Sequence, residues 1–170
     1  MTQETELILS IAGFPPYSGR GCFQQLMPAD KGFFQRTING ALSCISLETP
    51  LKYRSLIRGK DVSSPAFDRF WVNTQVTVGC IHRLWQRFKK GEAHLTLTRP
   101  PVEGSVCVVD CAGQPVPFVQ RDQDIRLQNP SSNETFVSFR PWLTMIVSDF
   151  RFETDEWGIA NAWQLILEEM

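Results

Sequence analysis

A thiol and an imidazole stand two residues apart at Cys80 and His82, and these are the residue types of a cysteine nucleophile and its general base. Residues two apart on a strand lie ~6 to 7 Å apart at their Cα atoms with parallel side chains, so a direct hydrogen bond is not expected. We interpret the two as filling one face of a strand. The acidic groups of "DFRFETDE" and "LEEM" could supply a general acid and base, but they are more typical of a solvated turn and a polar terminus.

The cysteines indicate neither a disulfide framework nor a metal site. Their number is odd and their spacing wide, which favours reduced thiols. "CVVDC" could form half of a metal site, but no second pair exists, and His82 and His94 lie in different segments. Phosphate-loop, zinc-protease and nucleophile-elbow motifs are also missing from the sequence. We therefore predict a protein that is not an enzyme, with no cofactor, no metal and no catalytic residues. The five cysteines are Cys22, Cys44, Cys80, Cys107 and Cys111.

One basic segment, "QRFKKGE", places Arg87, Lys89 and Lys90 beside Trp85 and Phe88. Such a segment can stack bases in an oligonucleotide-binding barrel, or it can be a charged turn between two strands. The chain carries 17 basic and 18 acidic side chains, so a nucleic-acid partner is not expected. The start of the chain has no basic leader, and no apolar run approaches the ~20 residues of a membrane span. These features predict a soluble protein made in the cytoplasm, without a membrane partner.

The elements that must position these residues are mainly strands. Phe occurs 12 times and Trp 5 times, and the apolar residues fall in short alternating runs, which predicts one β-barrel or β-sandwich domain. We expect strands within 6–14, 51–59, 75–85 and 93–99, with "GKD" as a turn after the second. Residues 100–134 are rich in turn formers and predict a small insertion, which leaves 1–99 and 135–170 as the β core. The last segment fits either a strand or a short amphipathic helix.

"FFQRTINGALSCIS" predicts a β-hairpin, because Asn39-Gly40 supplies the positive φ values of a two-residue type I′ turn. Such a loop sets the register and places Arg36 opposite Ser43, Ile38 opposite Ala41 and Phe34 opposite Ile45. Arg36 then lies on an otherwise apolar or small face, where it needs a partner.

Arg20 lies in "GFPPYSGRGCFQQL", after two prolines and between two glycines. Prolines stiffen the chain and glycines free it, so the segment predicts a stiff spacer followed by a flexible elbow that presents the arginine. Arg20 then contacts either another molecule or a carboxylate of its own chain, and the sequence leaves both open.

Four segments resemble a family of small tail proteins of tailed bacteriophages: "AGFPPYSGRGCFQQLMP", "RTINGALSCIS", "KYRSLIRG" and "RPWLTMIVSDFRFETDEWGIANAWQLILEEM". The matching patterns are an RG-x-x-Q-x-L segment at Arg20, Gly21, Gln24 and Leu26, an Arg-Thr before the Asn-Gly turn, and a closing Trp-x-Leu-x-Leu-Glu-Glu strand. The resemblance spans roughly the first 85 and the last 30 residues and leaves the turn-rich middle unmatched.

The resemblance implies a structural virion protein of the tail tip or baseplate. It implies a ring of three or six copies with hub, tube or baseplate proteins as partners, and a C-terminal strand. It also implies that Arg20, Gly21, Gln24 and Arg36 contact neighbouring subunits. A β-barrel module that binds an oligonucleotide or a glycan is the alternative.

Overall fold

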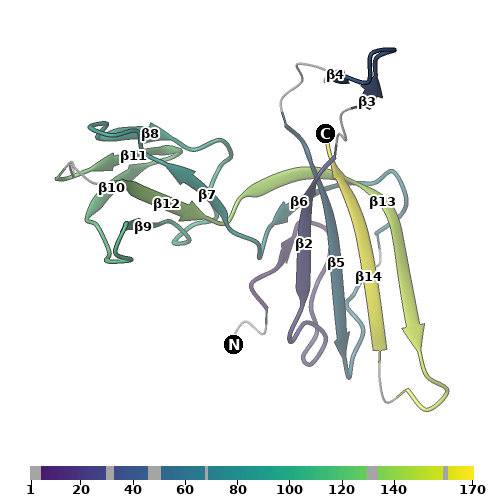
Figure 1. Cartoon of the computed structure of the whole chain (residues 1–170). Helices are drawn as coiled ribbons and strands as arrows, with labels where there is room; N and C mark the ends of the chain where they lie inside the picture. The colour runs from purple at the N-terminus through teal and green to yellow at the C-terminus, as the bar shows by residue number, and fades with distance from the viewer. Residues whose placement is uncertain (1–4, 30–32, 46–50, 68, 130–133, 159–160) are drawn as a thin grey trace.

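The computed structural model describes residues 5–29, 33–45, 51–67, 69–129, 134–158 and 161–170. All regular elements among these residues are strands, which confirms the predicted mainly β fold. The largest sheet is a curled, six-stranded half-barrel (Figure 1). Its strands, in spatial order, are β1 (Ile8–Leu9), β6 (Gln75–Gly79), β13 (Trp142–Thr154), β14 (Asn161–Glu169), β5 (Tyr53–Asp61) and β2 (Phe23–Pro28).

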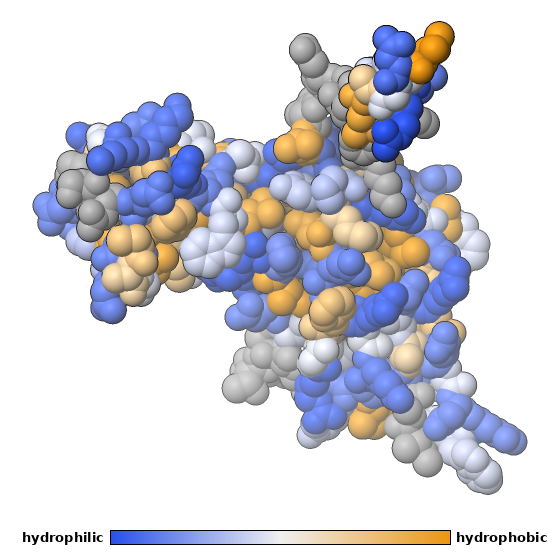
Figure 2. Space-filling model, viewed as in Figure 1, coloured by the Kyte–Doolittle hydropathy of each residue, from blue (hydrophilic) through white to orange (hydrophobic). Residues whose placement is uncertain are grey.

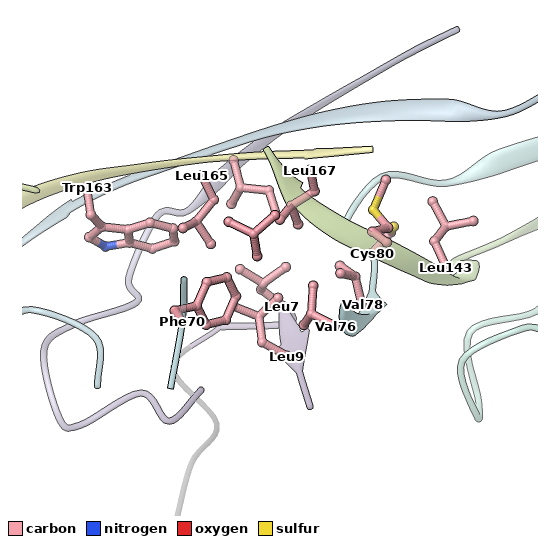
Figure 3. Packing of buried hydrophobic residues seen from close by; sticks show 13 residues of the cluster. Leu7, Leu9, Phe70, Val76, Val78, Cys80, Leu143, Trp163, Leu165 and Leu167 are labelled. Atoms are coloured by element: carbon pink, nitrogen blue, oxygen red, sulfur yellow. The ribbon is translucent and has the colours of Figure 1, made fainter. Parts of the chain in front are cut away.

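The concave face of the half-barrel holds the larger hydrophobic core (Figure 3). Alternating side chains of β14, namely Trp163, Leu165 and Leu167, are buried there, because every second residue of a strand points to the same face. This pattern answers the question left open at the C-terminus, which forms a strand. β6 contributes Val76 and Val78, as its predicted alternation required. The alternating apolar residues of the C-terminal segment also include Ile159, which lies outside the described residues.

A second unit lies beside the half-barrel and has its own core. The chain enters it after β6 and returns along β12 into β13. The unit is wider than the turn-rich segment 100–134, because three of its six strands come from outside that range. Its two sheets have the order β10-β11-β8 and β7-β12-β9. The strands are β7 (Leu84–Arg87), β8 (His94–Thr96), β9 (Cys107–Asp110), β10 (Phe118–Arg121), β11 (Asp124–Leu127) and β12 (Thr135–Phe139).

The chain passes between the half-barrel and the second unit at two places, and an arginine makes hydrogen bonds at each. Arg83, just before β7, donates from Nη2 to the carbonyls of Ser105 and Ser138. Arg140, just after β12, donates from Nε to the Cys80 carbonyl at 2.8 Å and from Nη2 to the Glu6 carbonyl. Since guanidinium groups offer several donors in a fixed plane, each arginine joins segments distant in sequence.

The hairpin β3 (Phe33–Arg36) and β4 (Leu42–Ile45) stands away from both units in Figure 1. The predicted hairpin exists, but the predicted register is wrong by one residue, because Arg36 faces Leu42 and not Ser43. The loop has three residues, closed by Thr37 N–H to the Ala41 carbonyl at 2.9 Å. Only Gly40 has a positive φ, 78°, so the turn is of type I followed by a glycine bulge rather than type I′.

Three further expectations about strand bounds are wrong. The strand expected over 75–85 ends at Gly79, so Cys80 and His82 do not fill one face of a strand. The first strand is only two residues long, because the chain turns directly after Leu9. "GKD" continues β5 instead of forming a turn. Gly59 has a packing role there: a Cβ at this position would lie 2.4 Å from Cε2 of Trp163, so the indole occupies the space that a side chain would need.

Candidate interaction site

Arg20 binds a carboxylate of its own chain. Its Nη2 lies 2.7 Å from Oδ1 of Asp61, its Nε lies 3.2 Å from both carboxylate oxygens, and its backbone N–H donates to Oδ2 at 3.0 Å. Asp61 ends β5 with a side chain that is only 4% exposed, whereas that of Arg20 is 50% exposed. Of the two partners that the sequence left open for Arg20, the structure shows a carboxylate of its own chain, and the arginine clamps the elbow to β5.

The elbow owes its shape to residues on both sides of Arg20. Tyr17 and Gly21 both have positive φ values, 63° and 67°, and the second suits a glycine because it carries no Cβ. The Ser18 hydroxyl donates to the Pro15 carbonyl at 2.6 Å and closes the turn after the prolines. The chain thereby brings the Tyr17 ring to 4.5 Å from the Arg20 guanidinium carbon, a cation–π contact.

The electrostatics of this clamp depend on the Asp61 charge. The hydrogen bonds from the Arg20 side chain lower the pKa of Asp61 from 3.8 to about 2, and backbone donors at Val62 and Arg20 add to this effect against the cost of burial. Asp61 is thus charged throughout the physiological range, and its charge is matched by the arginine. The arrangement holds a loop in place and has no free acid or base to offer a reaction.

Gln24, a predicted contact residue, is buried and bridges two ends of the half-barrel. Its Nε2 donates to the Ser55 hydroxyl at 2.9 Å, and its Oε1 accepts from the backbone N–H groups of Ile81 and His82 at 2.7 and 3.0 Å. β2 is an edge strand of the sheet, whose other edge strand is β1. The Gln24 side chain therefore links the β2 edge to the segment that follows β6.

Arg36 makes its described hydrogen bond within the hairpin itself. The Arg36 Nη1 donates to the Gly40 carbonyl at 3.1 Å, so the loop itself supplies the partner that the sequence called for. Asn39 and Gly40 form the exposed tip together with Ile38, whose side chain is fully exposed. The structure therefore places Arg20, Gly21 and Gln24 around the end of β5 and Arg36 in a separate place.

Sequence reasoning missed a shallow basic hollow on the outer face of the half-barrel. Its charged residues are Arg58, Lys60, Arg151 and Glu153, and its lining also includes Phe23 and the predicted contact residue Gly21. Arg58 and Lys60 alternate with buried residues of β5, and this alternation in "YRSLIRGK" was the available signal. Figure 2 shows polar and apolar side chains interleaved over β5 and β14 on this face.

The residues that could take part in catalysis, base stacking or metal binding are not brought together into one site. Cys80 is buried, which raises the pKa of its thiol to about 11, while the His82 side chain is exposed beyond the end of β6. In the basic segment Phe88 belongs to the second core, so only Trp85 is exposed for stacking. Cys22, Cys80, Cys107 and Cys111 are free thiols, and no group of His, Cys, Asp or Glu able to hold a metal ion occurs among the described residues.

No protein-family model matches the chain, and no curated protein is significantly similar to it. Within the part of the chain that the structure covers, no helix is long and apolar enough to span a membrane.

Proposed function

We propose that this protein is a structural component of a bacteriophage tail, at the tail tip or baseplate, and that it acts by assembly rather than catalysis. The resemblance of its N-terminal, hairpin and C-terminal segments to small tail proteins suggests this class. We further propose a ring of three or six copies that contacts hub, tube or baseplate neighbours, because closed rotational symmetry repeats one contact at every copy.

The observation that carries the proposal is the β3–β4 hairpin. Its strands pair only with each other among the described strands, and none of its described side chains belongs to either hydrophobic core. Ile38 is fully exposed at its tip and Leu42 is 62% exposed. An isolated two-stranded hairpin is marginally stable in water, so its apolar residues are available to a partner surface.

The clamp at Arg20 changes where the contacts are placed. Since Arg20 and Gln24 hold the protein's own elbow and margins together, we assign them to shaping the subunit and assign the contact with neighbours to the hairpin, which includes Arg36. The elbow still presents an exposed ring at Tyr17.

Two measurements test the proposal. Mass spectrometry of purified virions should detect the protein at a fixed number of copies per tail, and its absence from virions would refute the tail assignment. In infected cells, Ile38→Asp with Leu42→Asp should block incorporation into tails while the isolated protein stays folded. Val119→Asp is the control, because Val119 is another exposed apolar residue, 45% exposed, on a strand of the second unit away from the hairpin.

A further inference from the structure

The basic hollow on the outer face of the half-barrel contains one row of side chains across four neighbouring strands. Phe23 of β2 lies opposite Arg58 of β5, and Arg58 lies opposite Gln164 of β14. Gln164 in turn lies opposite Arg151 of β13. Figure 1 shows these four strands side by side. Neighbouring strands lie ~4.8 Å apart, so the row places an aromatic ring, a cation, an amide and a second cation within ~15 Å.

The next row along the sheet has a short side chain at its centre. Ala162 of β14 lies between its cross-strand partners, Lys60 of β5 and Glu153 of β13. Because the alanine methyl group is much shorter than the two flanking side chains, the surface is lowered at this point. The hollow has a volume of about 600 Å³, which falls within the ~300 to 1,000 Å³ of small-molecule sites.

Two cations of the hollow have no carboxylate partner among the described residues, namely Arg58 and Lys60, and both are exposed. Arg151 differs from them, because its Nε lies 3.1 Å from Oδ2 of Asp149. Arg58 and Lys60 are two positions apart on one strand, so both project from the same face, with ~6.5 Å between their Cα atoms. A phosphate monoester between them can accept hydrogen bonds from both, and its charge of close to −2 at neutral pH matches theirs.

The residues beside these cations narrow the class of phosphate compound. The Phe23 ring is 58% exposed, and its position opposite Arg58 sets it within reach of a group attached to the phosphate. Nucleobases stack on exposed aromatic side chains, whichever base is present. Glu153 lines the hollow from β13, on the side away from Phe23, and repels a second phosphate. The hollow therefore suits one nucleotide rather than a strand of nucleic acid.

We propose that the basic hollow binds a nucleoside monophosphate. The phosphate lies between Arg58 and Lys60 beside Ala162, and the base stacks on Phe23. The Gln164 amide, next to Arg58 in the row, donates a further hydrogen bond to the phosphate. This inference does not rest on the tail assignment, because it concerns a small ligand on the isolated subunit.

Titration of the purified full chain with AMP, followed by two-dimensional NMR of the backbone amides, tests the proposal. At low ionic strength, where exposed charges are least screened, AMP should give saturable shifts that cluster at Gly21, Arg58 and Ala162. Ribose 5-phosphate lacks the base and adenosine lacks the phosphate, so each should bind about fivefold or more weakly than AMP. A short single strand of oligoadenylate, compared at equal nucleotide concentration, should bind no more tightly than AMP.

Four variants, each checked for folding by circular dichroism, assign the binding to side chains. Arg58→Gln and Phe23→Leu should each weaken AMP binding by about fivefold or more, the first at the phosphate and the second at the base. Glu153→Gln removes a repelling charge and should tighten binding by about twofold or more, a gain that misfolding does not produce. Arg54→Gln is the matched control, because Arg54 projects from the same face of β5 but pairs with Glu168 outside the hollow.

Several outcomes contradict the proposal. Absence of saturable shifts at ~10 mM AMP, well above millimolar dissociation constants, overturns it. So does equal binding of AMP and either of its two parts, because the phosphate and the ring then do not act together. An oligoadenylate that binds more tightly than AMP indicates a surface for a nucleic-acid strand instead. An Arg54→Gln variant that binds as weakly as Arg58→Gln shows that only the general charge of the face is involved.

Discussion

At the scale of single residues, the Arg20–Asp61 pair shows how a contact residue and an internal clamp can look alike in sequence. A proline pair and flanking glycines do expose the arginine by half, but the partner lies 41 positions away at the end of β5. No local pattern marks Asp61 as that partner, since a strand residue followed by a loop is an ordinary place for an aspartate.

Arg20→Ala should destabilise the isolated protein by about 1 to 3 kcal/mol, because it leaves the buried Asp61 carboxylate with backbone donors only. Urea denaturation measures the change. Arg87→Ala serves as the control and should be nearly silent, since its ion pair with Glu134 is exposed on both sides. Equal midpoints for Arg20→Ala and wild type would show that the clamp contributes nothing to stability.

The same pair predicts how stability varies with acid. The folded pKa of Asp61 is about 2 against an ordinary 3.8, so the unfolded chain binds the proton more tightly. The stabilisation is complete above about pH 4 to 5 and is lost as the pH falls toward 2. In thermal melts over this range, the stability difference between wild type and Asp61→Asn should shrink as acid is added. A difference that is constant with pH would contradict the lowered pKa.

At the scale of elements, alternation and turn residues predicted which segments form strands better than they predicted which residues contact one another. Short alternating runs predicted the strands at β5 and β6, because one buried face imposes a period of two, but they left the segment of β14 open between a strand and a helix. The hairpin was predicted but its register was not, since Asn-Gly is compatible with more than one loop length and only Gly40 adopts a positive φ. Gln24 could not be predicted to be a buried bridge, because its partners come from β5 and the segment after β6.

Gly59→Ala should destabilise the protein by about 1 to 3 kcal/mol, the usual cost of overpacking a filled core. The added Cβ would lie 2.4 to 2.5 Å from the Trp163 indole, which must then shift within the aromatic cluster that it shares with Phe14 and Phe67. Guanidinium denaturation monitored by tryptophan fluorescence measures the effect. Gly13→Ala is the control, because a Cβ there meets nothing within 4 Å. A Gly59→Ala variant as stable as Gly13→Ala would show that the indole is not confined.

At the scale of the whole molecule, two hydrophobic cores are connected by two chain crossings. The crossings are adjacent, because Leu84 and Phe139 are paired residues of β7 and β12, and paired residues of antiparallel strands lie ~4.5 to 5.5 Å apart at Cα. The second unit is therefore inserted at a point where a short turn could replace it. Turn-rich composition predicted an insertion. It did not predict that β7, β8 and β12 belong to the inserted unit, because their sequences are ordinary strand sequences.

Replacing residues 84–139 with a Gly-Gly turn should leave the half-barrel folded, since none of the buried residues of its core lies within 84–139. The shortened chain loses Arg99, whose Nε lies 2.6 Å from Oε1 of Glu169. Glu169→Gln should therefore cost about 1 to 3 kcal/mol in the full chain, where it removes a charge-assisted hydrogen bond, and close to nothing in the shortened chain. Near-ultraviolet circular dichroism and urea melts of the four proteins measure both effects. A shortened chain without a cooperative transition would mean that the half-barrel depends on the second unit, and an equal cost in both chains would mean that Glu169 acts through its other partner, the Tyr53 N–H.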